Sequence, residues 1–325
     1  MANSISTLPA EGHAKGRDKY ERLVASAQSL ARLKVAVVHP CDAASLGAAV
    51  DCADIGLISP VLIGPLAKLQ ATAATLGRDL ANFEIVDVPH SHAAAERAVE
   101  LVKAGRAEAL MKGSLHTDEL MAAVVRRDGG LRTARRISHC FVLDVPGHDS
   151  ALIITDAAIN IAPTLDDKVD IVQNAIDLAH ALKVEEVRVA ILAAAETVNS
   201  KMPSTIDAAA LCKMADRGQI TGAILDGPLA LDNAIDIGAA QIKNIKSPVA
   251  GRANVLVVPD LEAGNMLAKS LTFLAGADAA GIVLGTRVPI ILTSRADSAR
   301  ARRASCALAS LVAEAQRSKC AIIGV

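Results

Sequence analysis

Short apolar runs alternate with amphipathic segments along most of the chain. Alanine-rich segments of helical length separate the first four runs, which are KVAVV (34–38), PVLIG (60–64), FEIVDV (83–88) and EALMKG (108–113). A helix is predicted to begin near Arg17, because Tyr20, Leu23 and Val24 start a helical spacing of apolar residues. This alternation favours right-handed βαβ units and a parallel sheet.

The pattern changes in the middle of the chain. RISHCFVLDV (136–145) and SALIITD (150–156) are separated by Pro146-Gly147-His148-Asp149, a sequence typical of a hairpin turn. A mixed sheet is therefore expected at this point. Beyond it the alternation resumes, with predicted helices at 165–182, 203–217, 230–243, 260–275 and 296–317. Predicted strands lie at 188–192, 219–225, 253–258, 281–285 and 289–293.

Length and composition narrow the class of protein. A chain of 325 residues is long enough for two domains of average size. Hydrophobic residues make up 52% of it but aromatic residues only 1%, and 34 basic residues face 35 acidic ones. Binding of nucleic acid is not expected, because it relies on aromatic platforms and a net basic groove.

No targeting or membrane segment is predicted. The first 16 residues are polar, and charges interrupt every later apolar run short of the roughly 18 residues that span a bilayer. We therefore expect a cytoplasmic protein with no membrane partner. The six cysteines form no C-x-x-C pair, so neither a metal site nor a redox dithiol is predicted.

Four polar segments follow predicted strands, where the ligands of open parallel sheets gather. In the first, Lys112 and Gly113 end a strand, and Thr117 precedes Asp118 and Glu119. Thr117 is interpreted as the N-cap of a helix whose first turn is acidic. The functional interpretation is that Lys112 binds an anionic ligand, while Gly113 lets that ligand approach backbone N–H groups.

The second and third segments also allow two interpretations each. Asp226-Gly227-Pro228 follows a strand, and it is either a tight turn or part of a binding site. Arg287 ends another strand just before Pro289 opens the next one. The side chain of Arg287 therefore either extends to solvent or binds an anion.

The fourth segment is TSRAD, residues 293–297. Ser294-x-x-Asp297 fits a capping box, with Ser294 as the N-cap and Asp297 near the helix N-terminus. Arg295 is not explained by a cap, because the helix dipole opposes a cation in the first turn, and it indicates an anionic ligand. Arg302 returns to nearly the same helical face as Arg295. Two further basic residues, Arg300 and Arg303, are interpreted as a solvated basic face of the helix.

These segments together resemble the phosphate acetyltransferase and phosphate butyryltransferase family. The resemblance runs from about Leu33 to the C-terminus and is densest in ALMKG, ITDAAIN, ILDGPLALDNAI, NVLVVPDLEAGNMLAKSL and GIVLGTRVPIILTSRADS. It implies an α/β fold of two three-layer domains around a cleft, similar to isocitrate and isopropylmalate dehydrogenases. Domain I would comprise residues 1–143 plus 288–325 and domain II residues 144–287, with the active site in the cleft between them.

The resemblance implies reversible acyl transfer, in which acyl-CoA and phosphate give acyl phosphate and CoA. Acetyl-CoA is the expected substrate, no bound cofactor is expected, and we expect a homodimer. In acetyl-transferring relatives a Ser-Arg pair stabilises the transition state, which makes Ser294 and Arg295 the expected catalytic residues. Those relatives place an aspartate, the proposed base, where this chain has Ala301, so Asp297 becomes a candidate base or CoA-site residue. The residues expected to bind CoA or phosphate are Lys112, Gly113, Thr117, Asp226, Gly227, Pro228, Arg287 and Asp297.

Three alternatives stay open at this point. The Lys112-Gly113 pair and the SRAD sequence resemble the butyryl-type branch, which makes a phosphate butyryltransferase with a longer acyl preference the first alternative. The second is a metal- and NAD(P)-dependent dehydrogenase of similar architecture. The third, motivated by Ala301, is a non-catalytic CoA-binding module.

Overall fold

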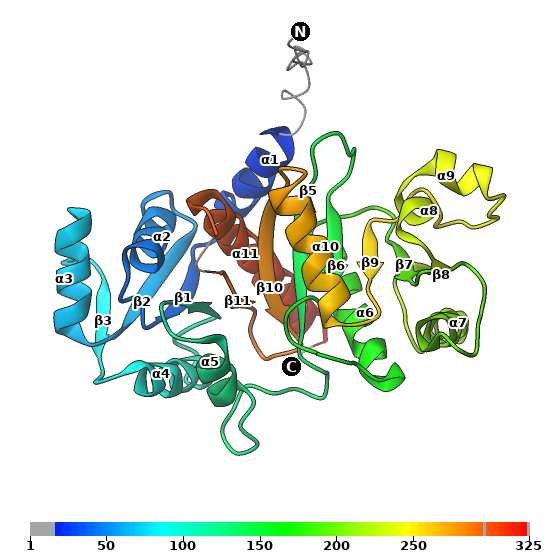
Figure 1. The fold of residues 1–325 in the computed structure, drawn as a ribbon. Coiled ribbons are helices and arrows are strands. Elements are labelled where there is room, and N and C mark those ends of the chain that lie inside the picture. Colours follow the sequence, from blue (N-terminus) through cyan, green and yellow to red (C-terminus); the bar gives the residue numbers. More distant parts are fainter. Residues whose placement is uncertain (1–16, 295–296, 324–325) are drawn as a thin grey trace, which may run out of the picture.

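The computed structural model describes residues 17–294 and 297–323. Their strands form one 11-stranded sheet of order β3-β2-β1-β4-β11-β10-β5-β6-β9-β7-β8 (Figure 1). One half of the sheet contains β3 (Glu84–Asp87), β2 (Ile58–Gly64), β1 (Leu33–Val38), β4 (Ala109–Lys112) and β11 (Ile290–Ile291). The other half contains β10 (Asp278–Leu284), β5 (Ser138–Asp144), β6 (Leu152–Thr155), β9 (Val255–Val257), β7 (Arg188–Leu192) and β8 (Ile224–Leu229).

The sheet contains two sets of parallel strands that run in opposite directions. Strands β3, β2, β1, β4 and β11 are parallel to one another, as are β6, β9, β7 and β8. Between these sets, β10 is antiparallel to both β11 and β5, and β5 is antiparallel to β6. The carboxyl ends of the two parallel sets therefore lie at opposite ends of the sheet.

Helices cover both faces of the sheet. One face packs against α1 (Arg17–Gln28), α2 (Ala43–Asp54), α3 (Leu66–Leu76), α6 (Leu165–Ala181), α7 (Pro203–Asp216) and α11 (Ala299–Ile323). The other face packs against α4 (Ser91–Lys103), α5 (Thr117–Val124), α8 (Leu231–Ile235), α9 (Ile237–Ile242) and α10 (Leu261–Phe273). The layers are helix, sheet and helix, with an almost wholly aliphatic core, as the scarcity of aromatic residues requires.

Most predicted elements are confirmed, but several of their boundaries differ. The hairpin predicted at Pro146-Gly147 joins β5 to β6. The strand predicted at 219–225 starts only at Ile224, because Gly222 has a left-handed backbone (φ 87°) that ends the preceding turn. The helix predicted at 230–243 is divided into α8 and α9, because Asp236 is extended and caps α9 by accepting a hydrogen bond from the Ala239 N–H. The last helix begins at Ala299 instead of residue 296.

The division into two domains stays a prediction. Its boundaries fall at the end of β5 and between β10 and β11, while β5 and β10 pair with each other along their whole length. The cytoplasmic location also stays a prediction. Among the helices of the described residues, none has the length and apolar character needed to cross a bilayer.

Candidate functional site

A cavity of about 400 Å³ lies between α5 and α10 on the face of the sheet that these helices cover. Its wall on the α5 side contains Lys112, Leu115, His116 and Thr117, and α10 contributes Asn265, Ala268, Lys269, Thr272 and Phe273. The remaining lining residues include His139, Phe141, Ala279 and the segment that follows β11, namely Leu292, Thr293, Ser294 and Asp297. Four predicted site residues therefore meet at one cavity: Lys112, Thr117, Ser294 and Asp297.

Strand pairing explains why Lys112 and Ser294 come together. β4 and β11 are parallel neighbours, with Leu110 opposite Ile290 and Met111 opposite Ile291. The residues that follow these pairs leave the sheet at the same end. Lys112 is only 6% exposed, and its Nζ donates to the carbonyl of Gly113 at 3.3 Å. A buried cation is thus held beside the Ser294 segment, as an anion-binding role for Lys112 requires.

Gly113 has a structural role beside its predicted role in ligand binding, which stays a prediction. Its N–H donates to the carbonyl of Val38 at 2.9 Å, so this donor is already used within the protein. A Cβ at position 113 would lie 2.3 Å from the Val38 carbonyl oxygen and 2.5 Å from that of His39. Glycine is therefore needed because β1 passes too close for a side chain.

The predicted N-cap at Thr117 is wrong by one residue. His116 is the N-cap of α5, with an extended backbone and no side-chain capping bond, and Thr117 is the first helical residue. Asp118 and Glu119 lie in the first turn, as predicted. Thr117 lines the cavity.

The predicted cap at Ser294 is also wrong. Because α11 starts at Ala299, its N-cap is Ser298, whose hydroxyl accepts a hydrogen bond from the Ala301 N–H at 3.1 Å. The Ser294 N–H instead donates to the Asp297 carboxylate at 2.6 Å, and the Asp297 N–H donates to the Ser294 carbonyl at 3.2 Å. The hydroxyl of Ser294 is therefore not required for the helix end. Arg295 lies outside the described residues, and its catalytic role stays a prediction.

The basic residues of α11 are not a solvated face. Arg302 is 4% exposed, and its guanidinium donates to the Thr293 hydroxyl at 3.0 Å and to the Ser294 carbonyl at 2.8 Å. Arg300 lies 3.5 Å above the Tyr20 ring and pairs with Asp278 at 2.7 Å. Arg303 is partly buried. The interpretation of Arg300 and Arg303 as solvated was wrong because α1 covers this part of α11.

Two other predicted segments lie away from the cavity. Asp226-Gly227-Pro228 forms the middle of β8, the last strand of the sheet, and is not the predicted turn. A Cβ on Gly227 would lie 2.7 Å from the Ile191 carbonyl oxygen, so this glycine serves the contact with β7. Arg287 is exposed and follows the antiparallel strand β10, whose carboxyl end lies opposite the carboxyl ends of β4 and β11. Their predicted binding roles gain no support from these positions.

His139 is a cavity residue that sequence analysis missed. It lies on β5, is 1% exposed, and contacts Phe141 edge to face, with ring centroids 4.5 Å apart. Burial lowers the pKa of His139 to about 4, although attraction to Asp156 acts in the opposite direction. The imidazole is therefore neutral at physiological pH. In the sequence, His139 lies within an apolar run and is not distinguishable from a core residue.

Lys269 and Asn265 are further polar residues of the cavity that the sequence did not indicate. Both lie on α10, and the Asn265 amide donates to the carbonyl of Ala157 at 3.2 Å. In the sequence they look like ordinary polar positions of an amphipathic helix. Together with Lys112, Lys269 makes the cavity wall basic. Among the residues that the structure describes, no cluster of three His, Cys, Asp or Glu could hold a metal ion.

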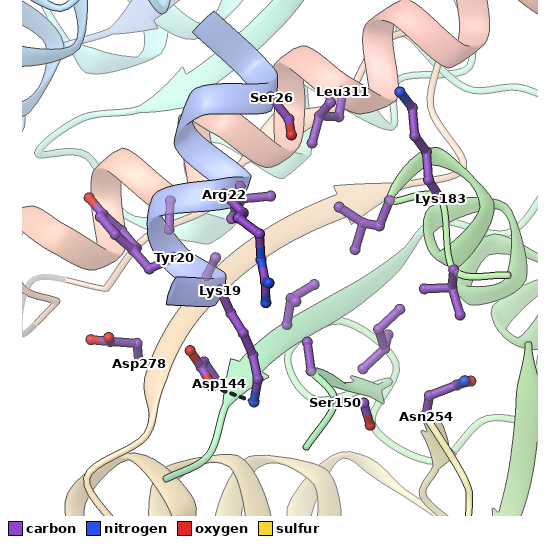
Figure 2. Close-up of a pocket in the computed structure, with 18 of the residues that line it drawn as sticks. Lys19, Tyr20, Arg22, Ser26, Asp144, Ser150, Lys183, Asn254, Asp278 and Leu311 are labelled. Carbon is purple, nitrogen blue, oxygen red and sulfur yellow. Dashed lines mark hydrogen bonds and ion pairs between the residues drawn. The ribbon is translucent and has the colours of Figure 1, made fainter. Parts of the chain in front are cut away.

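A second cavity of about 370 Å³ lies on the opposite face of the sheet, between α1, α6 and α11 (Figure 2). Its walls are mainly apolar. Lys19 extends from α1 towards Asp144, to which its Nζ donates at 3.0 Å (Figure 2). No described member of the predicted site lines this cavity. Convergent polar groups, which orient substrates in binding sites, are found in the first cavity.

Comparisons with known proteins show which family the chain is similar to. Residues 91–310 match the sequence profile of the family described as Phosphate acetyl/butaryl transferase. The chain is 65% identical over 299 residues to the phosphate acetyltransferase of Rhizobium meliloti, covering 92% of this chain and 95% of the relative. It is 41% identical over 294 residues to the phosphate butyryltransferase of Clostridium acetobutylicum, covering 90% of this chain and 98% of the relative.

A solved structure shares the fold. The branched-chain phosphotransacylase from Enterococcus faecalis V583 matches with a TM-score of 0.75 at 29% sequence identity. The match covers 86% of this chain and 99% of that structure. The α/β class and the helix–sheet–helix layers predicted from sequence are thereby confirmed.

Proposed function

The chain belongs to the phosphate acetyl/butaryl transferase family, and on that premise we propose that it transfers an acetyl group reversibly between coenzyme A and inorganic phosphate. In one direction acetyl-CoA and phosphate give acetyl phosphate and CoA. The observation that carries this proposal is the meeting of Lys112 and Ser294 at one cavity. The protein is accordingly an acyltransferase that uses CoA as a substrate.

The charge around the cavity suits these substrates. Phosphate and the CoA pyrophosphate are anions, and Lys112 and Lys269 line the cavity. Arg302 adds a buried positive charge directly behind Ser294. Within the described chain, no carboxylate lies in ion-pair contact with Arg302. Buried charge without a protein counter-ion favours an anionic substrate nearby.

Ser294 and Arg295 are proposed to stabilise the negative charge that develops on the acyl carbonyl oxygen and the phosphate. Ser294 is an exposed residue of the cavity wall, and Ser298 rather than Ser294 caps the helix. Asp297 is proposed as a positioning residue, because its carboxylate accepts the Ser294 N–H at 2.6 Å. Because position 301 is alanine, this proposal assigns no base to the CoA thiol.

Homodimer formation is part of the proposal. Ile242 is 88% exposed and Ile237 is 44% exposed, and both lie on α9 near the β8 end of the sheet (Figure 1). Large apolar side chains that are exposed on a surface helix can contribute to an interface between proteins. Light scattering should give twice the 33.5 kDa mass of the chain, and Ile242→Asp should lower it to that of a monomer. A monomeric wild type would refute this part of the proposal.

The activity is tested by incubating the protein with acetyl-CoA and phosphate and following the release of free thiol. Release that requires phosphate and yields acetyl phosphate is expected. A non-catalytic CoA-binding module would bind acetyl-CoA without releasing thiol, and absence of release with every short acyl-CoA would refute the proposal.

Phosphate butyryl transfer is the second candidate function. Its support is the butyryltransferase relative at 41% identity together with the Lys112-Gly113 sequence. A series of acyl-CoA substrates from two to six carbons separates the candidates. A kcat/KM that is highest for acetyl-CoA favours the first, and a maximum at butyryl-CoA favours the second.

A further inference from the structure

The imidazole of His139 lines the cavity, and the neighbouring residues fix its position. His139 lies on β5 opposite Val283 of β10. A Cβ on Gly281 would lie 3.0 Å from His139 Nε2 and 2.8 Å from the Leu292 carbonyl oxygen. The absence of a side chain at Gly281 therefore leaves the space that the ring occupies, and Phe141 supports the ring from the side.

Packing alone does not explain a histidine at this position. The ring is 1% exposed, and Nδ1 is buried without a hydrogen-bond partner. Burying an unpaired polar nitrogen costs free energy, which an aliphatic or phenyl side chain of similar size would avoid. Unpaired buried polar groups in folded proteins call for an explanation, and a role at a functional site is one.

The charged neighbours of His139 do not occupy its ring nitrogens. Asp156 is the carboxylate next to it at the end of β6, but it accepts hydrogen bonds from the backbone N–H groups of Ala158, Ile159 and Asn160 and from the Asn160 side chain. The other charged residues that line the cavity with His139 are Lys112, Lys269 and Asp297. Burial outweighs the attraction of Asp156 and keeps the ring neutral, so that the ring retains one N–H donor and one acceptor nitrogen.

We propose that His139 is a further catalytic residue, whose imidazole donates a hydrogen bond to the carbonyl oxygen of the acyl group during transfer. This inference rests on the proposed acyl transfer. When CoA attacks acetyl phosphate, the C–S bond forms, the C–O bond to phosphate breaks, and phosphate leaves with the electron pair. The thiol proton ends on phosphate or in solvent, and His139 keeps its own proton. A donor held in place at a developing oxyanion typically contributes about 10²- to 10³-fold in rate.

The test removes the ring nitrogens while keeping an apolar side chain of similar size. His139→Leu is expected to lower kcat by about 10²-fold while KM for CoA stays within about twofold, because the interaction forms only in the transition state. His139→Gln, which retains an N–H donor, is expected to recover part of the lost kcat. A folded His139→Leu variant with wild-type kcat would overturn the inference.

Controls separate this inference from folding and from the proposed function. Cys140 is the next residue of β5, is fully buried on the opposite face, and Cys140→Ala should lower thermal stability without lowering kcat. If the leucine variant does not fold, His139→Phe keeps a ring against Phe141 and has the same expected loss. A wild type without any acyl transfer refutes the proposed function, whereas an active wild type with equally active apolar variants refutes only the role of His139.

A measurement on the wild-type protein adds a readout that does not depend on an apolar variant. In protein labelled with ¹⁵N-histidine, the imidazole signal missing from His139→Gln is expected to shift when acetonyl-CoA, a non-reactive ketone analogue, is added. A saturating addition that leaves this signal unchanged would overturn the proposed contact.

Discussion

The guanidinium of Arg302 donates a hydrogen bond to the hydroxyl of Thr293 across 3.0 Å. A second bond from the same group reaches the Ser294 carbonyl at 2.8 Å. α11 therefore holds the segment that follows β11 in place from behind. Because hydrogen bonds from a charged donor are stronger than neutral ones, this contact fixes the position of Ser294 in the cavity wall.

Replacing Arg302 tests this contact. Arg302→Met is expected to lower kcat by about 10-fold or more, since a bond from a charged group contributes about 1.5–3 kcal/mol. Arg302→Lys should recover little, because an ammonium group cannot make both contacts in the same geometry. Steady-state kinetics of both variants measure the effect. Arg300→Met is the matched control: it removes the contacts with Tyr20 and Asp278 and should change stability but not kcat.

Ser294 and Ser298 are expected to have separable roles. Ser294→Ala should lower kcat by about 10²- to 10³-fold, as loss of a transition-state donor does, with little change in stability. Ser298→Ala should leave kcat nearly unchanged and cost about 1 kcal/mol of stability, because it removes the cap of α11. Kinetics and urea unfolding of both variants check this. The reverse pattern would return Ser294 to a capping role.

Ser294 was predicted to cap α11, but Ser298 is the residue that caps it. Ser294-x-x-Asp297 fits the capping-box spacing, and the Asp297 carboxylate does bond the Ser294 backbone. This hydrogen bond and a capping box have the same residue spacing. They differ only in whether the helix begins at this point, and the spacing does not show where α11 begins. The order of strands and helices was predictable, since the alternation of apolar and amphipathic segments is strong over most of the chain.

Strand direction explains why Arg287 does not lie beside Lys112. GIVLG has the composition of a buried strand, and nothing in it indicates that β10 is antiparallel to both neighbours. Arg287 was therefore expected near Lys112 but lies at the other end of the sheet. In contrast, the meeting of Lys112 with Ser294 depends on the pairing of β4 with β11, which are far apart in sequence. Sequence analysis placed both residues after predicted strands, and the family resemblance assigned them to one site before the fold was known.

Lys112 is expected to bind phosphate. Lys112→Met should raise KM for phosphate by about 10- to 100-fold, the range expected for loss of a charge-assisted hydrogen bond. Lys34→Met is the control, because Lys34 lies on the neighbouring strand β1 but is exposed at its opposite end. Initial rates at varied phosphate concentrations measure both. Equal KM values in the two variants would exclude Lys112 from the phosphate site.

His139 should make stability depend on pH. Its pKa is lowered by burial to about 4 in the folded chain, against about 6.5 for an unperturbed histidine. Between these values the unfolded chain binds a proton at this residue that the folded chain does not. The contribution is therefore fully present above pH about 6.5 and is lost as the pH falls towards 4. Urea unfolding between pH 7.5 and 4.5 should show a steeper loss for the wild type than for His139→Leu, and parallel curves would contradict this assignment.

Gly113 links the stability of the fold to the geometry of the cavity. A Cβ at this position would lie 2.3 Å from the carbonyl oxygen of Val38, and neither backbone can move without disturbing the pairing of β1 with β4. Gly113→Ala should therefore lower the free energy of unfolding by about 3 kcal/mol or more. Because Lys112 is the preceding residue, any protein that still folds should also have a displaced lysine and a reduced kcat/KM for phosphate.

Gly47 provides the matched control for that substitution. It lies within α2, and a Cβ there would meet only Leu76 at an ordinary contact distance of 3.8 Å. Gly47→Ala should therefore raise stability by up to about 1 kcal/mol, as expected for glycine replaced inside a helix, with kinetics unchanged. Urea unfolding and phosphate kinetics of the two variants should move in opposite directions from the wild type. If Gly113→Ala were as stable and as active as Gly47→Ala, the close approach of β1 to this position would not constrain the lysine.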